Sequence, residues 1–126
     1  MNDIIGPLRR IAAGDGSGVL AEIIETEGSS PRKAGARMIL HSDGTFSGTV
    51  GGGILERHAK EETHAVMLSR RETEIRYSLG NAGSSGRDIG SICGGSALLQ
   101  YSAVQLTWVE VGTVYTRLRF STQGDI

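Results

Sequence analysis

Apolar side chains recur along this chain with two different periods, and these periods predict where helices and strands lie. Over residues 3–13 they return every three or four positions, which predicts a short helix with Asp3 as its cap. The same spacing over residues 54–70 predicts a second helix. The apolar stripe of this helix consists of Leu55, Ala59 and Val66, flanked by Ile54, Ala65 and Leu68.

Runs rich in β-branched and apolar residues predict the strands. They cover residues 19–26, 36–41 and 45–50 before the second helix, and 72–79, 96–101, 105–111 and 113–121 after it. Asp43-Gly44 lies between the second and third runs, and Asp-Gly in that position is a strong hairpin signal. The stretch 80–90 is rich in small residues and is expected to be a loop.

The order of these elements is helix, three strands, helix and then further strands. A doubly wound parallel sheet would need regular alternation of strands and helices, so the pattern favours an α+β fold instead. We expect one mixed domain over residues 1–126, with two helices and a mostly antiparallel or mixed sheet. Its core should lie within residues 19–101, with the strands over 105–121 added at the C-terminal side.

Charge and cysteine content narrow the class of protein. Thirteen basic and fourteen acidic residues give a net charge of -1, which provides no general attraction to nucleic acid or to an anionic membrane. No stretch approaches the roughly 20 apolar residues that span a bilayer. Cys93 is the single cysteine, so an internal disulfide is impossible. We therefore expect a cytoplasmic protein that binds neither nucleic acid nor membrane.

Glycine is the most unusual feature of the composition. The chain has 19 glycines, where average usage of about 7% would give roughly nine. Gly51, Gly52 and Gly53 run directly into the second helix, where free backbone N–H groups and the helix dipole favour an anion. Glu56 is in the first turn, where the dipole favours a carboxylate that can also orient a ligand. The alternative is a tight strand-to-helix turn with no ligand.

Hydroxyl and basic side chains gather in the loop that precedes the second strand. Ser29, Ser30 and Arg32 lie in this loop and Arg37 follows it, a combination that suits phosphate recognition. For any one of these residues, a solvated basic loop is the safer interpretation. Gly51–Gly53, which follow one hairpin later in the sequence, favour the interpretation as a phosphate-binding loop.

Cys93 is followed by Gly94 and Gly95, so its thiol is flanked by small residues that a bulky ligand can approach. The alternative is a buried cysteine that packs as a small apolar side chain, which is the commoner fate of a lone cysteine. His58 and His64 are six residues apart on the second helix and do not share a face. We therefore expect no metal site made of protein ligands.

Two blocks of the sequence resemble the N-terminal domain of the XdhC/CoxI family, which matures molybdenum hydroxylases. The similarity extends over residues 19–101. The first block comprises Gly28-Ser29-Ser30-Pro31-Arg32, Gly35-Ala36-Arg37-Met38, Asp43-Gly44, Gly48-Thr49-Val50-Gly51-Gly52-Gly53 and Leu55-Glu56. The second block is Cys93-Gly94-Gly95. Neither block alone is specific, but the two together are.

The resemblance implies an accessory factor that transiently binds molybdenum cofactor, assists its sulfuration and passes it to a xanthine dehydrogenase-type apo-enzyme. Such a factor is a chaperone for the cofactor more than a turnover enzyme. Its partners would be the apo-hydroxylase, a cysteine desulfurase and further copies of itself. By matching position, Cys93 would be the sulfur relay or the thiol next to the metal. The cofactor site would be lined by Ser29, Ser30, Arg32, Arg37, Gly51, Gly52, Gly53, Glu56, Gly94 and Gly95.

The sequence departs from the family pattern in two places. Family members carry a second, Rossmann-like domain after this one, so we expect either a stand-alone version of this domain or a Rossmann-like partner on a separate chain. Many relatives also have a cysteine directly after the glycine turn, where this chain has Ile54. Two other functions remain open: a nucleotide-linked oxidoreductase subunit, and an oligomerisation or structural module. The latter would pair through a late strand that contains Trp108, Val109 and Val111.

Overall fold

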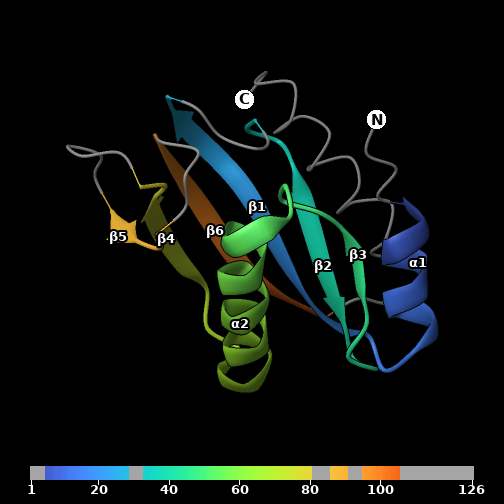
Figure 1. Ribbon diagram of the computed structural model, residues 1–126. Helices are drawn as coiled ribbons and strands as arrows, with labels where there is room; N and C mark the ends of the chain where they lie inside the picture. Colours follow the sequence, from blue (N-terminus) through green and yellow to red (C-terminus); the bar gives the residue numbers. More distant parts are fainter. Residues whose placement is uncertain (1–4, 29–32, 81–85, 91–94, 106–126) are drawn as a thin grey trace.

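Residues 5–28, 33–80, 86–90 and 95–105 are described by the computed structural model of this chain (Figure 1). Within them the helices are α1 (Ile5–Ala13) and α2 (Gly53–Ser69). The strands are β1 (Ser17–Glu27), β2 (Arg37–His41), β3 (Phe46–Gly48), β4 (Thr73–Ser78), β5 (Arg87–Asp88) and β6 (Ser96–Gln105). Apart from Gln105, the strands expected over 105–111 and 113–121 lie outside the described residues.

The strands form one sheet in the order β3-β2-β1-β6-β4-β5. Every neighbouring pair is antiparallel except β4 and β5, which are parallel. The predicted α+β class with a mixed sheet is therefore confirmed, as is the presence of both expected helices. No helix in the described part of the chain has the length and apolarity needed to cross a membrane.

The pairing of β1 with β6 forms the centre of the sheet. The two strands run side by side from Ser17↔Gln105 to Glu27↔Ser96, with a bulge at Ile24. The sequence pattern predicted an interruption between residues 101 and 105, and this prediction was wrong. β6 continues without a break because β1 begins at Ser17 and pairs with the extra residues. The predicted loop over 80–90 likewise contains β5, which pairs with β4.

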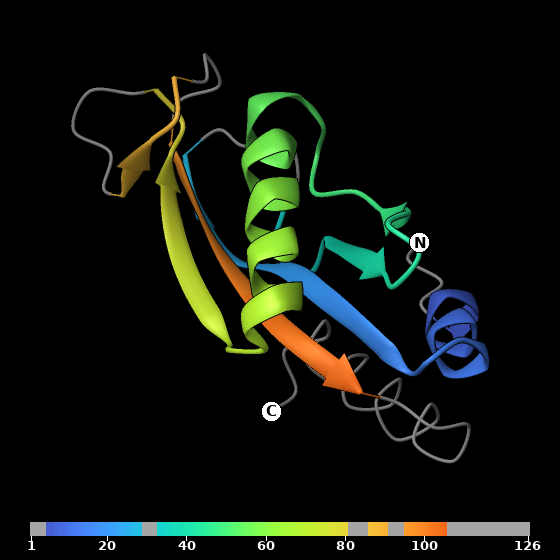
Figure 2. The same ribbon diagram turned by 90° about the horizontal axis from the view of Figure 1, so that it is seen from below.

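Helix α2 covers one face of the sheet and α1 lies against the other (Figure 2). Alternate residues of the strands face α2, so Val19, Ala21 and Ile23 enter the main core while Glu22 does not. A Cβ atom on Gly18 would lie 2.7 Å from Ile11 Cδ1, so α1 packs onto the sheet at a position that excludes a side chain. The core cluster consists of Val19, Ala21, Ile23, Met38, Leu40, Val50, Leu55, Ala59, Val66, Ile75, Tyr77, Leu79, Ile89, Ala97, Leu99 and Tyr101.

The apolar stripe of α2 is narrower than the sequence suggested. Leu55, Ala59 and Val66 are buried as predicted, but Ala65 is exposed and the Leu68 side chain is 87% exposed. Thr63 is buried in their place, and its hydroxyl donates to the carbonyl of Lys60 in the same helix. The fully buried positions 55, 59, 63 and 66 recur every three or four residues, so they lie along one line of the helix that faces the sheet.

The topology brings the chain to two opposite ends of the sheet, which differ in character (Figure 1). We call one the glycine end, because Gly28 follows β1 there, Gly51–Gly53 precede α2 and Gly95 precedes β6. The other is the clasped end, where the β2–β3 hairpin, the C-terminus of α2 and the end of β6 meet. Gly28 and Gly51–Gly53 of the first block and Gly95 of the second therefore lie at the same end of the fold, whereas Asp43-Gly44 of the first block lies at the clasped end.

Candidate functional site

A close approach at the glycine end joins two segments far apart in sequence. Gly28 follows β1 and Gly95 precedes β6, and the last ladder pair of these strands is Glu27↔Ser96. A Cβ atom on Gly28 would lie 2.9 Å from the Cα atom of Gly95. Gly28 also has a φ of 68°, which favours glycine. The two backbones can pass this closely only because Gly28 carries no side chain.

The glycine turn that precedes α2 has an unusual conformation. Gly51, Gly52 and Gly53 have φ angles of 119°, 76° and 61°, all positive. Three consecutive residues of this kind would be strained with any other side chain. A Cβ atom on Gly52 or Gly53 would meet nothing within 4 Å, so the turn requires glycine for its backbone angles and not for lack of space.

Glu56 organises this turn from the first turn of α2. Its Oε1 atom accepts hydrogen bonds from the N–H of Val50 at 3.1 Å and the N–H of Gly52 at 3.0 Å. The same oxygen accepts a hydrogen bond from the hydroxyl of Thr49. The Thr49 hydroxyl oxygen in turn accepts from the N–H of Gly51 at 3.0 Å. Three successive main-chain donors are thereby satisfied within the turn.

Opposing effects act on the pKa of the Glu56 carboxyl. Partial burial raises this pKa, but the hydrogen bonds from Thr49, Gly52 and Val50 outweigh burial, with a smaller contribution from Lys60, and the net shift is downward. Oε2 faces the ammonium of Lys60 at 3.8 Å, and that ammonium also lies 5.0 Å from the centre of the Phe46 ring. Glu56 is thus an ionised group at neutral pH whose two oxygens both have partners.

The next three main-chain donors remain open. The N–H groups of Gly53, Ile54 and Leu55 make no hydrogen bond with any residue in the described ranges, whereas the N–H of Glu56 closes the first helical turn onto Gly52 O at 3.3 Å. Helix α2 has no side-chain cap. These N–H groups can donate hydrogen bonds to an anionic group at the N-terminus of α2, which is the positive end of the helix dipole.

Arg37 lies at the glycine end, but its side chain is on the sheet face away from α2. It pairs across the strands with Glu22, with Nε and Nη2 each 3.1 Å from Oε2. The guanidinium-bearing side chain is only 6% exposed. Burial raises the pKa of Glu22, and the charge of Arg37 opposes that shift. The predicted contact between Arg37 and a ligand remains a prediction.

Several predicted site residues lie outside the described part of the chain: Ser29, Ser30, Arg32, Cys93 and Gly94. The described members are Arg37, Gly51, Gly52, Gly53, Glu56 and Gly95. The structure brings Glu56 together with the glycine turn, and Gly95 together with Gly28. It places the side chain of Arg37 on the opposite face from α2.

Two residues that the sequence patterns did not single out take part in the polar contacts of this end. Thr49 links Gly51 to Glu56, and its position two residues before the glycine run is a recognisable hydroxyl-turn signal. Arg76 on β4 contacts Glu25 at 2.6 Å and Glu27 at 3.2 Å on the face away from α2. No local signal identifies Arg76, because strand register alone brings it opposite these carboxylates.

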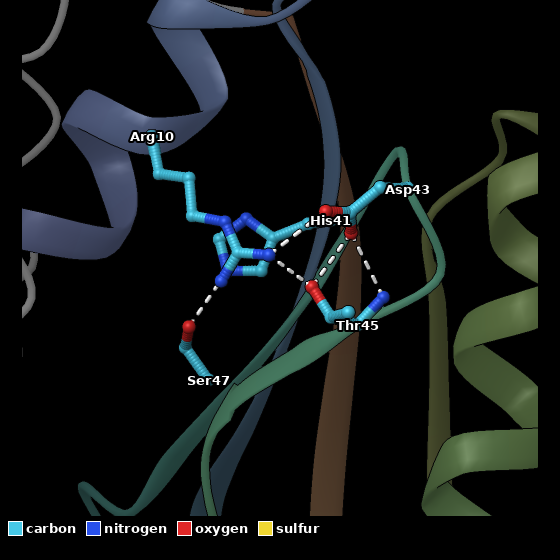
Figure 3. A network of polar contacts seen from close by, with 5 residues as sticks. All are labelled: Arg10, His41, Asp43, Thr45 and Ser47. Carbon is cyan, nitrogen blue, oxygen red and sulfur yellow. Dashed lines mark hydrogen bonds and ion pairs between the residues drawn. The ribbon is translucent and has the colours of Figure 1, made fainter.

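A separate polar network occupies the clasped end (Figure 3). Arg10 reaches from α1 to Asp43 Oδ2 at 2.9 Å and also donates to the hydroxyl of Thr45. The His41 ring is buried and its Nε2 lies 2.7 Å from Ser47 Oγ, while Nδ1 has no hydrogen-bond partner among the described residues. Burial lowers the pKa of His41, Arg10 lowers it further, and Asp43 partly offsets both. This network fastens α1 to the hairpin.

The described residues contain no group of three or more His, Cys, Asp or Glu side chains that could hold a metal ion. The described part of the candidate site consists of main-chain donors and glycine backbone, with Glu56 and Thr49 bonded to the turn. Main-chain donors at a helix N-terminus suit an anionic group such as a phosphate.

Comparisons with known proteins agree on one family. The model of the XdhC and CoxI family matches residues 11–78. The chain is 40% identical over 81 residues to the molybdenum cofactor insertion chaperone PaoD of Escherichia coli strain K12, which is 64% of this chain and 24% of that protein. It is 37% identical over 78 residues to the uncharacterized protein YqeB of the same organism, covering 61% of this chain and 14% of that protein.

A solved structure shows the same fold. A crystal structure described as a xanthine dehydrogenase from Bacillus halodurans superposes with a TM-score of 0.64 and 32% sequence identity. The match covers 81% of this chain and 30% of that one. The chain thus spans less than a third of the length of each of these relatives.

Proposed function

This chain belongs to the XdhC and CoxI family, and from that premise we propose that it binds molybdenum cofactor and assists its insertion into a molybdenum hydroxylase. The cofactor is cargo here, taken up and passed on. Sulfuration of the cofactor before transfer is part of the proposal. The apo-hydroxylase and a cysteine desulfurase are the proposed partners, the cytoplasm is the proposed compartment, and further copies of the same chain are the proposed oligomer.

The observation that carries this proposal is the contact between Gly28 and Gly95. Gly28 leads into Ser29, Ser30 and Arg32, and Gly95 follows Cys93 and Gly94. The loop that begins after Gly28 and the segment that ends at Gly95 therefore meet the sheet at adjacent points. The proposal adds that both segments contact one ligand.

The chemistry of the cargo fits what this end offers. Its phosphate suits the open N–H groups in the first turn of α2, together with the Arg32 guanidinium. Its flat pterin suits backbone that carries no side chains. Its molybdenum is a metal that a soft thiolate can approach, which assigns Cys93 the position nearest the metal. Arg37 is included in the proposed site on the sequence resemblance alone.

The test is retention of the cargo. The purified chain is mixed with molybdenum cofactor released from a denatured hydroxylase and then desalted, and bound molybdenum and pterin are quantified. We expect retention by the wild type and by Leu68→Ala, a control on the exposed face of α2. Folded wild-type protein that retains no cofactor would contradict the proposal and favour an oligomerisation module.

The thiol has its own test. Cys93→Ala should reduce transfer of sulfurated cofactor to the apo-hydroxylase more than it reduces thermal stability or cofactor retention. Equal transfer by the variant and the wild type would remove Cys93 from the proposal while leaving cofactor binding intact.

One observation favours a second candidate, a subunit of a nucleotide-linked oxidoreductase. The chain is 32% identical to a structure described as a xanthine dehydrogenase and spans only 30% of it. Under this alternative, the glycine end would bind a nucleotide phosphate. Titration with NADH and with molybdenum cofactor, compared on the same preparation, separates the two candidates.

A further inference from the structure

We propose that Glu56 is a positioning residue, which shapes the glycine turn so that open main-chain donors face the cargo, and does not itself contact the cargo. This inference rests on the proposed function and refines the role that the sequence resemblance gives to Glu56. It starts from one feature of the structure, a single carboxylate oxygen that accepts three hydrogen bonds from the turn before its own helix.

The bonds to Glu56 divide the donors of the turn into two groups. The N–H groups of Val50 and Gly52 bind Glu56 directly, and that of Gly51 binds it through Thr49. The next N–H groups in the chain, those of Gly53, Ile54 and Leu55, have no partner among the described residues. Glu56 thereby determines where the open donors begin.

A glycine turn needs such support. Three consecutive glycines lose more backbone entropy on ordering than other residues do. A Cβ atom on Gly52 or Gly53 would meet nothing within 4 Å, so no neighbouring atom crowds these residues. The hydrogen bonds to Thr49 and Glu56 are the contacts that hold the N–H groups of Gly51 and Gly52.

Both oxygens of the carboxylate already have partners, which argues against direct contact with the cargo. Oε1 is shared among three donors, and Oε2 faces Lys60. A negative charge in the first turn of α2 also opposes the approach of a phosphate to the same helix terminus. The acceptor atom Oε1 therefore supports the turn, whereas the negative charge of Glu56 does not favour binding of the cargo.

This distinction makes the experiment decisive. Glu56→Gln keeps an acceptor oxygen at the position of Oε1 and removes the charge, whereas Glu56→Ala removes both. If Glu56 positions the turn, Glu56→Gln should retain molybdenum cofactor at least as tightly as the wild type. Glu56→Ala should weaken retention by about tenfold or more, the range seen when a residue that orients a ligating group is removed.

Thr49 provides an independent variant at the same network. Thr49→Val removes the hydroxyl with little change of shape and should weaken retention in the same direction, and Thr49→Ser should restore it. The losses in Thr49→Val and Glu56→Ala should not add in the double variant, because both act through one set of bonds. Glu61→Ala, which removes an exposed carboxylate from the same helix, is the matched control and should bind like the wild type.

A readout without cargo checks the geometry itself. In the ligand-free protein, hydrogen exchange at the amides of Val50 and Gly52 should accelerate in Glu56→Ala and stay slow in Glu56→Gln. Unfolding temperature identifies any variant that fails to fold, and Thr49→Val then replaces Glu56→Ala.

The outcomes are distinct. Loss of retention in both Glu56→Gln and Glu56→Ala would overturn the inference, because the charged carboxylate itself would then be required. Full retention in Glu56→Ala and Thr49→Val would also overturn the inference, because the hydrogen bonds to the turn would then be unnecessary for binding. Absence of retention in the wild type would contradict the proposed function, and the exchange rates at Val50 and Gly52 would still decide whether Glu56 orders the turn.

Discussion

The two ends of the sheet solve the same problem, joining elements that are distant in sequence, by different means. At the clasped end, long side chains reach between elements: Arg10 contacts the β2–β3 hairpin, and Arg70 donates to the carbonyl of Val104 at 2.8 Å. At the glycine end, on the side of α2, main chain meets main chain at Gly28 and Gly95. There Glu56 is the side chain that orders the turn.

The two kinds of contact have different consequences. Side-chain links hold the fold together, whereas exposed backbone presents N–H groups to a ligand. A side-chain link uses its polar atoms on the protein itself, as Arg70 does with carbonyls of β1 and β6. Close-packed glycine backbone leaves N–H groups at the surface and lets a ligand approach them. The glycine end, where the turn before α2 leaves main-chain donors open, is therefore the better candidate site, although Arg37 and Arg76 form ion pairs on the face away from α2.

The largest expected effect is a difference in stability between the alanine variants of two glycines with positive φ, Gly28 and Gly44. Gly28→Ala at the glycine end should destabilise the protein by about 3 kcal/mol, because the new Cβ meets the backbone of Gly95 as well as adopting a strained φ. Gly44→Ala at the clasped end has the strained φ but open space, and should cost about 1 kcal/mol. Urea unfolding of both variants measures the difference, and equal losses would show that the two backbones do not constrain one another.

A smaller effect is expected at the C-terminus of α2. Arg70 has a φ of 59°, and its guanidinium donates to the carbonyls of Gly18 and Val104. Arg70→Ala keeps the strained backbone and loses these bonds, so the free energy of unfolding should fall by about 1 kcal/mol. Arg70→Gly loses the same bonds but relieves the strain, and should be about 1 kcal/mol more stable than Arg70→Ala. If the alanine variant matches the wild type, long side chains are not what secures this end.

The smallest effect is a change in how stability depends on pH. Because burial and Arg10 lower the pKa of His41, the folded state binds fewer protons than the unfolded chain just below the ordinary value of about 6.5. The contribution of neutral His41 is complete above that pH and is lost as the pH falls. Asp43 and Glu56, whose pKa values are lowered, lose their contributions only in more acidic solution, below about pH 4.5.

The variant for this prediction is His41→Leu, studied by urea unfolding at pH 7 and pH 5. The wild type should lose more stability over this interval than the variant does. Parallel losses would indicate that His41 remains accessible to protons in the folded state and that the network with Ser47 does not exclude them.

Local sequence patterns were enough to predict most of the fold. The periodicity of residues 54–70 located α2 to within one residue of each end, and Asp43-Gly44 located the β2–β3 hairpin. The glycine run before α2 identified an unusual turn. Local patterns failed at Ala65 and Leu68, because the width of the buried stripe depends on the surface that the helix meets.

The sequence by itself determined the elements, the fold class and the family, since periodicity, turn residues and motif spacing are properties of neighbouring positions. Only the tertiary structure decided which elements meet. Strand register pairs Arg37 with Glu22 on the face away from α2 and sets Gly28 against Gly95. It also decided that Glu56 binds its own turn. These contacts depend on the packing of segments that are far apart in sequence. No short stretch of sequence determines that packing alone.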